Sequence, residues 1–263
     1  MATFMHERNS GPTTLEKIAG GAVAGYVVVD AIRTIRQWHK MKDTIEPDAA
    51  RYYDHFARLY DVIAGEANWE EKAAQFIGKA VEIKSADTIR SAADLGAGNG
   101  YSVRGIQKHA SPERVVAVDI SPKMLERFRA SEGNGTAIET VEAPIERYVR
   151  ESEDTFDLIT SMSVLEYVPD LPDVLEHIPR LLNKGGVFAA TYVSQAETSQ
   201  HMATAESPFI SSKITQYSWF PEEVERSLTE GGLTILHRDN SQPAYELGSQ
   251  TVHYNFVVAG KPL

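Results

Sequence analysis

The chain has 263 residues, a formal net charge of −11 and no cysteine, and 42% of its residues are hydrophobic. That length is enough for one domain with a full core and a helical appendage. The lack of cysteine excludes disulfides, thiolate metal sites and a cysteine nucleophile, and it fits a cytoplasmic location. The acidic balance, without any basic run, argues against nucleic acid as a partner.

Residues 1–49 are expected to form a loose tail and a helix that runs towards Lys42. The uncharged stretch 18–29 is too short for a membrane span, which takes roughly 20 apolar residues. Gly21 and Gly25 are four residues apart, so one face of this helix would allow close approach of another helix. Two partners remain open for that face: the chain's own domain, or a second subunit in a homo-oligomer. Attachment to a membrane surface ranks behind both.

The next segment, 50–62, is rich in tyrosine. Its aromatic residues Tyr53, Phe56 and Tyr60 have helical spacing, which predicts a helix that packs on the core with one or two rings facing a ligand. Asn68, followed three residues later by Glu71, is typical of a capping pair that opens another helix.

Residues 94–100, Asp-Leu-Gly-Ala-Gly-Asn-Gly, are the most informative part of the chain. An apolar stretch, 89–95, precedes the glycines and a helix-compatible segment, 101–109, follows them. The order of strand, glycine turn and helix is how a doubly wound fold presents backbone N–H groups to a ligand. Glycine permits positive φ and close approach of the backbone. The dinucleotide fingerprint Gly-x-Gly-x-x-Gly does not fit, because residue 101 is Tyr.

A second acid supports a nucleoside site. The apolar run 115–118 ends in Asp119, nineteen residues after Gly100. A carboxylate at the end of the second strand can accept hydrogen bonds from both hydroxyls of a ribose. A nicotinamide enzyme would place an acid similarly, so Asp119 alone does not select the cofactor.

The remaining chain alternates between predicted strands and helices, which favours a doubly wound sheet. Further strands are expected at 137–141, from Phe156, at 187–193, at 233–236 and at 252–258, with helices from Ser121, from Pro172 to a glycine-rich turn at 183–186, and at 221–230.

The segment 194–220 is long for a plain connection, and it follows a strand at the edge where such sheets bind ligands. We expect a lid that forms a substrate wall. The alternative is an ordinary helical insertion that packs on itself.

In this order, residues 50–260 resemble the class I S-adenosylmethionine-dependent methyltransferases of the small-molecule type, and are similar to the ubiquinone and menaquinone biosynthesis group. The resemblance implies a Rossmann-like, seven-stranded, mostly parallel sheet whose last strand is antiparallel. The methyltransferase domain would cover 50–263, with the lid insertion at about 194–220. S-adenosylmethionine would be the cofactor and a small molecule the acceptor.

The resemblance also assigns roles to residues. Asp94, Gly96 and Gly98 would hold the methionine part of the cofactor, Asp119 its ribose, and Ile120 and Glu142 its adenine. The whole expected cofactor site is Asp94, Gly96, Ala97, Gly98, Asp119, Ile120, Met124, Glu142, Ala143 and Ser161.

Methyl transfer from a sulfonium is an in-line displacement, so catalysis depends mainly on positioning, although an oxygen acceptor can require a general base. Residues 165–169 resemble a Leu-Glu-His-Val-Pro string, with Tyr167 where many relatives carry His. The candidate catalytic residues are Tyr167, Glu166 and His201, with His55 considered beside them. No metal site is expected, because no cluster of ligands accompanies Glu166.

Two other functions remain open. The first is non-methyl-transfer chemistry on the same fold and cofactor. The second is a non-catalytic nucleoside-binding partner protein that uses the Gly21/Gly25 helix as its interaction surface. A nicotinamide oxidoreductase fits the glycine spacing least.

Overall fold

The structure is a computed structural model, and it describes residues 49–54, 57, 60, 68–131, 137–194, 202–206, 213–247 and 250–263. The predicted N-terminal helix, with Gly21 and Gly25, lies outside the described residues, as do His55, Phe56 and His201. Within the described residues, no helix combines the length and the apolar character needed to cross a bilayer.

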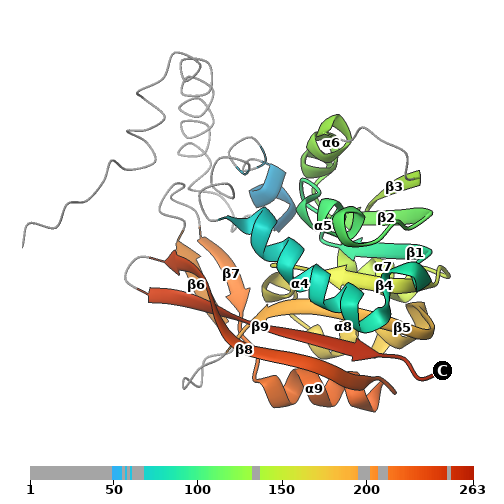
Figure 1. The fold of residues 1–263 in the computed structure, drawn as a ribbon. Coiled ribbons are helices and arrows are strands. Elements are labelled where there is room, and N and C mark those ends of the chain that lie inside the picture. Colours follow the sequence, from blue (N-terminus) through green and yellow to red (C-terminus); the bar gives the residue numbers. More distant parts are fainter. Residues whose placement is uncertain are drawn as a thin grey trace, which may run out of the picture. The chain divides into compact units, whose positions relative to one another are not determined.

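A seven-stranded sheet in the order β3-β2-β1-β4-β5-β9-β8 organises the described part of the chain (Figure 1). Strands β1 to β5 are parallel, whereas β9 runs antiparallel to both β5 and β8. This topology confirms the predicted fold. The strands are β1 (Ser91–Leu95), β2 (Arg114–Asp119), β3 (Ala137–Glu142), β4 (Phe156–Ser161), β5 (Leu182–Val193), β8 (Thr234–Leu247) and β9 (Gln250–Gly260).

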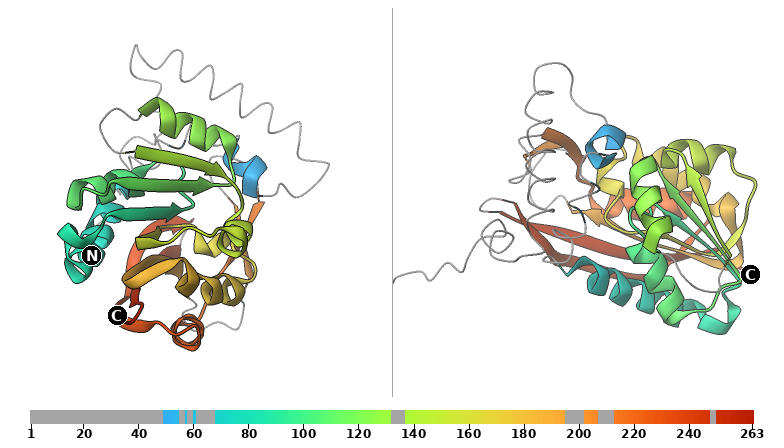
Figure 2. Two further views of the ribbon diagram at one scale, coloured as in Figure 1. Left: turned by 90° about the vertical axis from the view of Figure 1, so that its right-hand side faces the viewer. Right: turned by 90° about the horizontal axis from the view of Figure 1, so that it is seen from above.

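Helices cover both faces of the sheet (Figure 2). Successive strand residues point to opposite faces, so Ala92 packs in one core cluster and Ala93 in the other. The Ala92 cluster contains residues of α4 (Trp69–Lys84), α5 (Tyr101–His109) and α6 (Pro122–Ser131), and the Ala93 cluster contains residues of α7 (Ile145–Glu151), α8 (Leu171–His177) and α9 (Pro221–Glu230). Short 3-10 turns occur at η1 (Ala86–Thr88), η2 (Leu165–Tyr167) and η3 (Ile178–Leu181).

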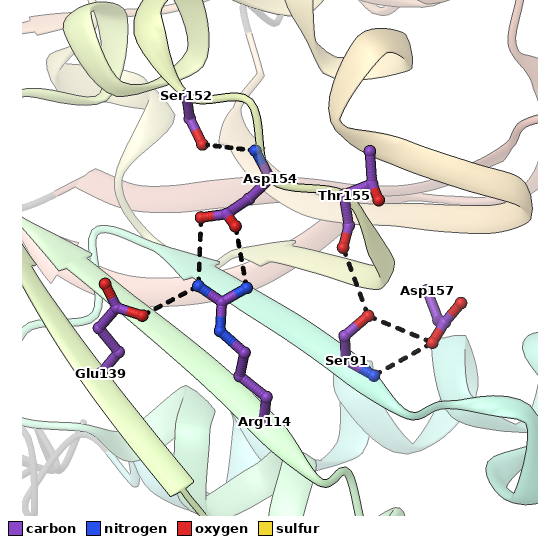
Figure 3. Close-up of polar contacts among 7 residues, drawn as sticks. All are labelled: Ser91, Arg114, Glu139, Ser152, Asp154, Thr155 and Asp157. Carbon is purple, nitrogen blue, oxygen red and sulfur yellow. Dashed lines mark hydrogen bonds and ion pairs between the residues drawn. The ribbon is translucent and has the colours of Figure 1, made fainter.

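Ion pairs and hydrogen bonds join neighbouring strands near their amino ends (Figure 3). Arg114 on β2 donates to Asp154, at 3.0 and 3.2 Å, and to Glu139 on β3, at 2.9 Å. Hydrogen bonds to these two carboxylates raise the pKa of Arg114. Asp157 at the start of β4 accepts from the backbone N–H of Ser91 on β1 at 3.0 Å. These contacts support the register of four strands at the edge opposite the glycine loop, although each partly exposed ion pair contributes little.

One predicted helix end is wrong. The glycine-rich turn at 183–186 does not end a helix: α8 ends at His177, and Gly185 and Gly186 lie inside β5, which begins at Leu182. The pairing of β4 with β5 shifts register between Phe156 and Leu158, so the glycines accommodate an irregularity in a strand. The helix predicted to open at Asn68 is confirmed, because α4 begins at Trp69 with Asn68 as its N-cap residue. The Asn68 side chain donates to the Glu71 carboxylate at 2.7 Å and does not cap the backbone.

The insertion at 194–220 contains an antiparallel hairpin of β6 (Met202–Glu206) and β7 (Lys213–Tyr217). The helical alternative is therefore wrong for the described part of this segment. After the hairpin, the backbone N–H of Trp219 donates to the Val193 carbonyl at 3.0 Å and returns the chain to the end of β5.

Gly100 and Gly232 give a matched test of packing in the glycine loop. Both have positive φ, +90° and +91°, but a Cβ on Gly100 would lie 2.2 Å from the Phe128 ring, whereas one on Gly232 meets nothing within 4 Å. Gly232→Ala should cost about 1–2 kcal/mol of unfolding free energy through backbone strain. Gly100→Ala should cost about 2–5 kcal/mol, because overpacking adds to that strain. Chemical denaturation measures both values, and equal losses would contradict the close contact with Phe128.

Candidate active site

The glycine loop connects β1 to α5. Gly96, Gly98 and Gly100 all have positive φ, at 83°, 54° and 90°. The backbone N–H groups of Gly96 and Ala97 both donate to the Val118 carbonyl of β2 at 2.8 Å. A Cβ on Gly96 would lie 2.4 Å from Val164, a residue that follows β4. Glycine is needed at this position because the loop is packed between two other segments of the protein.

Asp119, the last residue of β2, ties this loop to the next turn. Its carboxylate accepts from the Gly98 backbone N–H at 2.7 Å and from the Ser121 backbone N–H at 2.8 Å. Burial raises the pKa of Asp119 to about 6, although these two hydrogen bonds lower it. Each carboxylate oxygen has a second lone pair, so the group can also accept from a ligand's hydroxyls.

Asp94 lies in β1, two residues before the loop, and is completely buried. One of its oxygens accepts from the Thr160 hydroxyl at 2.7 Å, and the other has no hydrogen-bond partner among the described residues. Burial raises the pKa of Asp94 to about 7. A buried acceptor without a partner is costly, so a cationic or donating ligand group at this place would be stabilised.

A cavity of about 270 Å³ opens at the carboxyl ends of β1, β2 and β4, close to the lower end of the range of roughly 300–1,000 Å³ for ligand pockets. This is the edge at which doubly wound sheets bind ligands. Of the predicted site residues, the cavity brings together Gly96, Ala97, Gly98, Asp119, Ile120, Met124 and Tyr167.

Four predicted cofactor residues do not line this cavity: Asp94, Glu142, Ala143 and Ser161. Glu142 pairs with Asp119 in the sheet register, but it is exposed. The Ser161 hydroxyl is buried and donates to the Leu95 carbonyl at 2.9 Å. The lining on this side comes from the start of α7, where Glu146 is the acid. The prediction chose Glu142, which is the last residue of β3, whereas Glu146 lies in the first turn of α7. The two acids differ only in their position relative to the start of α7 at Ile145, which the sequence pattern did not fix.

Glu166 also lies away from the cavity. It is 1% exposed, and it accepts a hydrogen bond from the Tyr254 hydroxyl of β9. Its other oxygen has no hydrogen-bond partner among the described residues, and burial raises the pKa of the carboxyl to about 7. The structure therefore does not bring this candidate catalytic residue to the cavity. In the described residues, no group of three His, Cys, Asp or Glu side chains is arranged to hold a metal ion.

Tyr167 in η2 does line the cavity, and two distant segments meet it. Gln216, a buried residue of β7, donates from its side-chain amide to the Tyr167 hydroxyl at 3.1 Å. The Tyr53 ring stands edge-on to the Tyr167 ring, with centroids 5.5 Å apart. Sequence reasoning missed Gln216, because no local pattern marks a single amide in the insertion.

The cavity has an aromatic wall, formed by Tyr53, Tyr60, Trp69, Tyr101 and Tyr167. From the tyrosine-rich segment, Tyr53 and Tyr60 line the cavity, and that they face a ligand stays a prediction. Trp69 and Tyr101 were expected only as helix residues. Their helical positions are readable from the sequence, whereas the side of the helix that faces the cavity depends on the packing of α4 and α5.

Comparison with known proteins gives the class of methyltransferases that the sequence resembles. The family model described as "Methyltransferase domain" matches residues 93–190. A ubiquinone biosynthesis O-methyltransferase of Vibrio parahaemolyticus is 27% identical over 233 residues, covering 82% of this chain and 93% of that protein. A solved S-adenosylmethionine-dependent methyltransferase of Clostridium acetobutylicum has a TM-score of 0.59 and 17% identity, covering 80% of this chain and 99% of its own. The [4+2]-cyclase SpnF has a TM-score of 0.62 and 13% identity, over 83% and 98%.

The two structural likenesses show the fold alone, whereas the family model covers the glycine loop, Asp119 and β4. With the sheet topology, these findings place the chain in the class I S-adenosylmethionine-dependent methyltransferase superfamily. It is an enzyme that uses S-adenosylmethionine as the methyl donor and a small molecule as the acceptor.

Glu166→Gln tests the buried acid. Because the folded-state pKa of Glu166 is raised to about 7, the carboxyl favours folding below its ordinary pKa, and this contribution is lost as the pH rises through about 7. The variant keeps an oxygen for Tyr254 and cannot ionise. Its unfolding free energy relative to wild type should rise by about 1–3 kcal/mol between pH 5 and pH 8. Denaturant melts at several pH values measure this difference. A difference that does not change with pH would contradict the raised pKa.

Proposed function

We propose that this enzyme methylates an oxygen, nitrogen or carbon atom of a small, apolar or partly aromatic metabolite. The observation that carries the proposal is that one cavity is lined both by the glycine loop and Asp119 and by the aromatic wall. The printed name of the Vibrio relative, an O-methyltransferase, favours oxygen as the acceptor atom.

The described residues fit S-adenosylmethionine. Asp119 would accept from the ribose hydroxyls while the Gly98 and Ser121 N–H groups hold its carboxylate in place. Asp94 is buried and does not line the cavity, so we assign it no direct contact with the cofactor. Ile120, Met124 and Ile145 would form the apolar surround of the adenine, with Glu146 in place of Glu142 as the nearby acid. When bound, the cofactor supplies an electrophilic methyl group on a sulfonium.

On the acceptor side, we assign Tyr167 an orienting role. Its hydroxyl accepts from the Gln216 amide and shares a second hydrogen bond with the Tyr53 phenol, so two contacts fix its position in the cavity wall. A hydroxyl fixed in this way can direct an acceptor's lone pair towards the methyl group, and proximity of this kind provides much of the catalysis in methyl transfer. Glu166 has no part in this step, because it does not line the cavity.

The function is tested by incubating the enzyme with S-adenosylmethionine and a library of small metabolites, followed by mass spectrometry. We expect one metabolite class to gain the mass of a methylene group while S-adenosylhomocysteine accumulates. Conversion of a metabolite without a gain in mass would instead support the non-methyl-transfer alternative. Cofactor binding without turnover on any metabolite would support the partner-protein alternative.

Asp119→Ala should weaken cofactor binding by about one to three orders of magnitude, because a hydrogen bond to a charged group contributes about 1.5–3 kcal/mol. Calorimetric titration with S-adenosylhomocysteine measures the loss. Glu126→Ala, an exposed acid on the adjacent α6, is the matched control and should bind like wild type. A folded Asp119→Ala protein with wild-type affinity would remove Asp119 from the cofactor site.

Tyr167→Phe should lower kcat by about tenfold or less and leave cofactor affinity near the wild-type value, since one orienting hydrogen bond is worth about 1 kcal/mol. Gln216→Met should reproduce part of this loss and add nothing in the Tyr167→Phe background. Steady-state kinetics on the metabolite found above measure both effects. If kcat instead falls by about 10²-fold or more and one limb of the pH–rate profile disappears, Tyr167 acts as a general base and the orienting role is contradicted.

We further propose that the protein acts in the cytoplasm, binds no nucleic acid and self-associates through the segment 1–49. The absence of cysteine and the net charge of −11 support the first two statements, and the spacing of Gly21 and Gly25 supports the third.

Deleting residues 1–42 should lower the oligomeric state while cofactor affinity stays within a few-fold, because the residues that we assign to the cofactor, such as Gly98 and Asp119, lie in another part of the chain. Light scattering gives the mass of the full chain and of the truncated chain. The same number of subunits in both would contradict self-association through this segment. It would leave the alternative that the predicted helix packs on the chain's own domain.

A further inference from the structure

One buried acid has no place in the proposed reaction. Glu166 in η2 is 1% exposed and does not line the cavity, yet its carboxyl accepts a hydrogen bond from the Tyr254 hydroxyl of β9, 88 positions further along the chain. Its other oxygen has no hydrogen-bond partner in the described part of the chain. A buried hydroxyl that is bound to a buried carboxyl is held in one direction, because breaking this contact would leave buried polar atoms unsatisfied.

The Tyr254 ring extends this contact to helix α4. Tyr254 is 2% exposed, and its ring centroid lies 5.5 Å from that of Trp69, the first residue of α4. Phe256, two positions further along β9, pairs in the same way with Phe76, seven positions further along α4, at 4.7 Å. Residues two apart on a strand and seven apart on a helix share a face, so both ring pairs belong to one packed row between β9 and α4.

The two ring pairs differ in their surroundings. Trp69 lines the cavity, whereas Phe76 does not. Trp69 also begins its helix, and helix ends are held less firmly by the backbone than helix centres. Its ring therefore depends on side-chain packing for a fixed position. Tyr254 provides part of that packing, and its hydroxyl is bound by Glu166.

We propose that the Glu166–Tyr254 hydrogen bond is a positioning contact that holds Trp69 in the wall of the ligand cavity. The effect of Glu166 passes through Tyr254 to Trp69, so it is separate from the orienting role of Tyr167. The cavity, of about 270 Å³, is close to the lower end of the range for ligand pockets, so a displaced indole should change ligand affinity. This inference rests on the proposed function, because it takes the cavity as the ligand site.

The fluorescence of Trp69 tests its position. The chain contains three tryptophans, so Trp69 is the only one left in a full-length Trp38→Phe/Trp219→Phe background. There, Tyr254→Phe removes the hydroxyl and keeps the ring, and Glu166→Leu removes the acceptor at a similar volume. We expect each change to raise the quenching of Trp69 by acrylamide by about twofold or more, because a loosened ring is more often exposed. Glu166→Gln keeps an oxygen for Tyr254 and should stay close to the parent.

Ligand affinity is measured in the otherwise wild-type enzyme by calorimetric titration with S-adenosylhomocysteine. Tyr254→Phe and Glu166→Leu should each weaken binding by about threefold or more. The double variant should bind no more weakly than the weaker single variant, because both changes remove the same contact.

Tyr192→Phe is the matched control. Tyr192 is as buried as Tyr254, its hydroxyl accepts from the Asn255 amide at 3.3 Å, and it does not line the cavity. Loss of this hydroxyl should change neither the quenching of Trp69 nor the affinity for S-adenosylhomocysteine.

Unchanged quenching of Trp69 in Tyr254→Phe and Glu166→Leu would overturn the inference. An equal effect of Tyr192→Phe would also overturn it, because the change would then reflect a general loosening of the sheet. Increased quenching with wild-type affinity would refute the claim that this contact shapes the ligand cavity. If the background without Trp38 and Trp219 does not fold, the titrations decide alone, and wild-type affinity in both variants overturns the inference. Failure of the proposed function is recognised separately, because the wild-type enzyme would then not bind S-adenosylhomocysteine.

Discussion

The Asp119 carboxylate joins the parts of the donor site. By accepting from Gly98 on one side and Ser121 on the other, it fixes the glycine loop relative to the turn that begins α6. The same turn holds the tyrosine-rich segment, because the Ser121 hydroxyl donates to the Asp54 carboxylate at 2.6 Å. One buried acid thus lies at the centre of contacts from three segments that line the cavity, and its raised pKa reflects the cost of its burial.

The cavity lining has two parts of different physical character, which we propose serve the methyl donor and the acceptor and call the donor side and the acceptor side. The donor side consists of backbone turns and carboxylates, which suit a cofactor with hydroxyls and positive charge. The acceptor side consists of rings, and its polar centre is the Tyr167 hydroxyl with its Gln216 partner. Because transfer of a methyl group requires little covalent chemistry from the protein, a site that aligns two ligands in one enclosed space is sufficient for the proposed reaction.

The sequence revealed the features that depend on neighbouring residues in the chain. The strand–glycine–helix order and the acid at the end of β2 are local patterns, and both led to residues that line the cavity. Contacts between distant residues could not be read in this way. Gln216 reaches Tyr167 across 49 positions, and Tyr254 reaches Glu166 across 88. The resemblance of residues 165–169 to a family string also suggested Glu166 as a catalytic candidate. In the fold, its side chain is buried away from the cavity. Glu146 lines the cavity and Glu142 does not, because of where α7 begins. No spacing rule in the sequence fixes that helix start.

The most direct measurement is a crystal structure of the enzyme with S-adenosylhomocysteine. The account predicts that both ribose hydroxyls lie within hydrogen-bonding distance of the Asp119 carboxylate, which still accepts from the Gly98 N–H, and that the sulfur faces the cavity towards Tyr167. A cofactor whose ribose is bound by another acid, such as Glu146, or that occupies a place away from the glycine loop, would contradict the account.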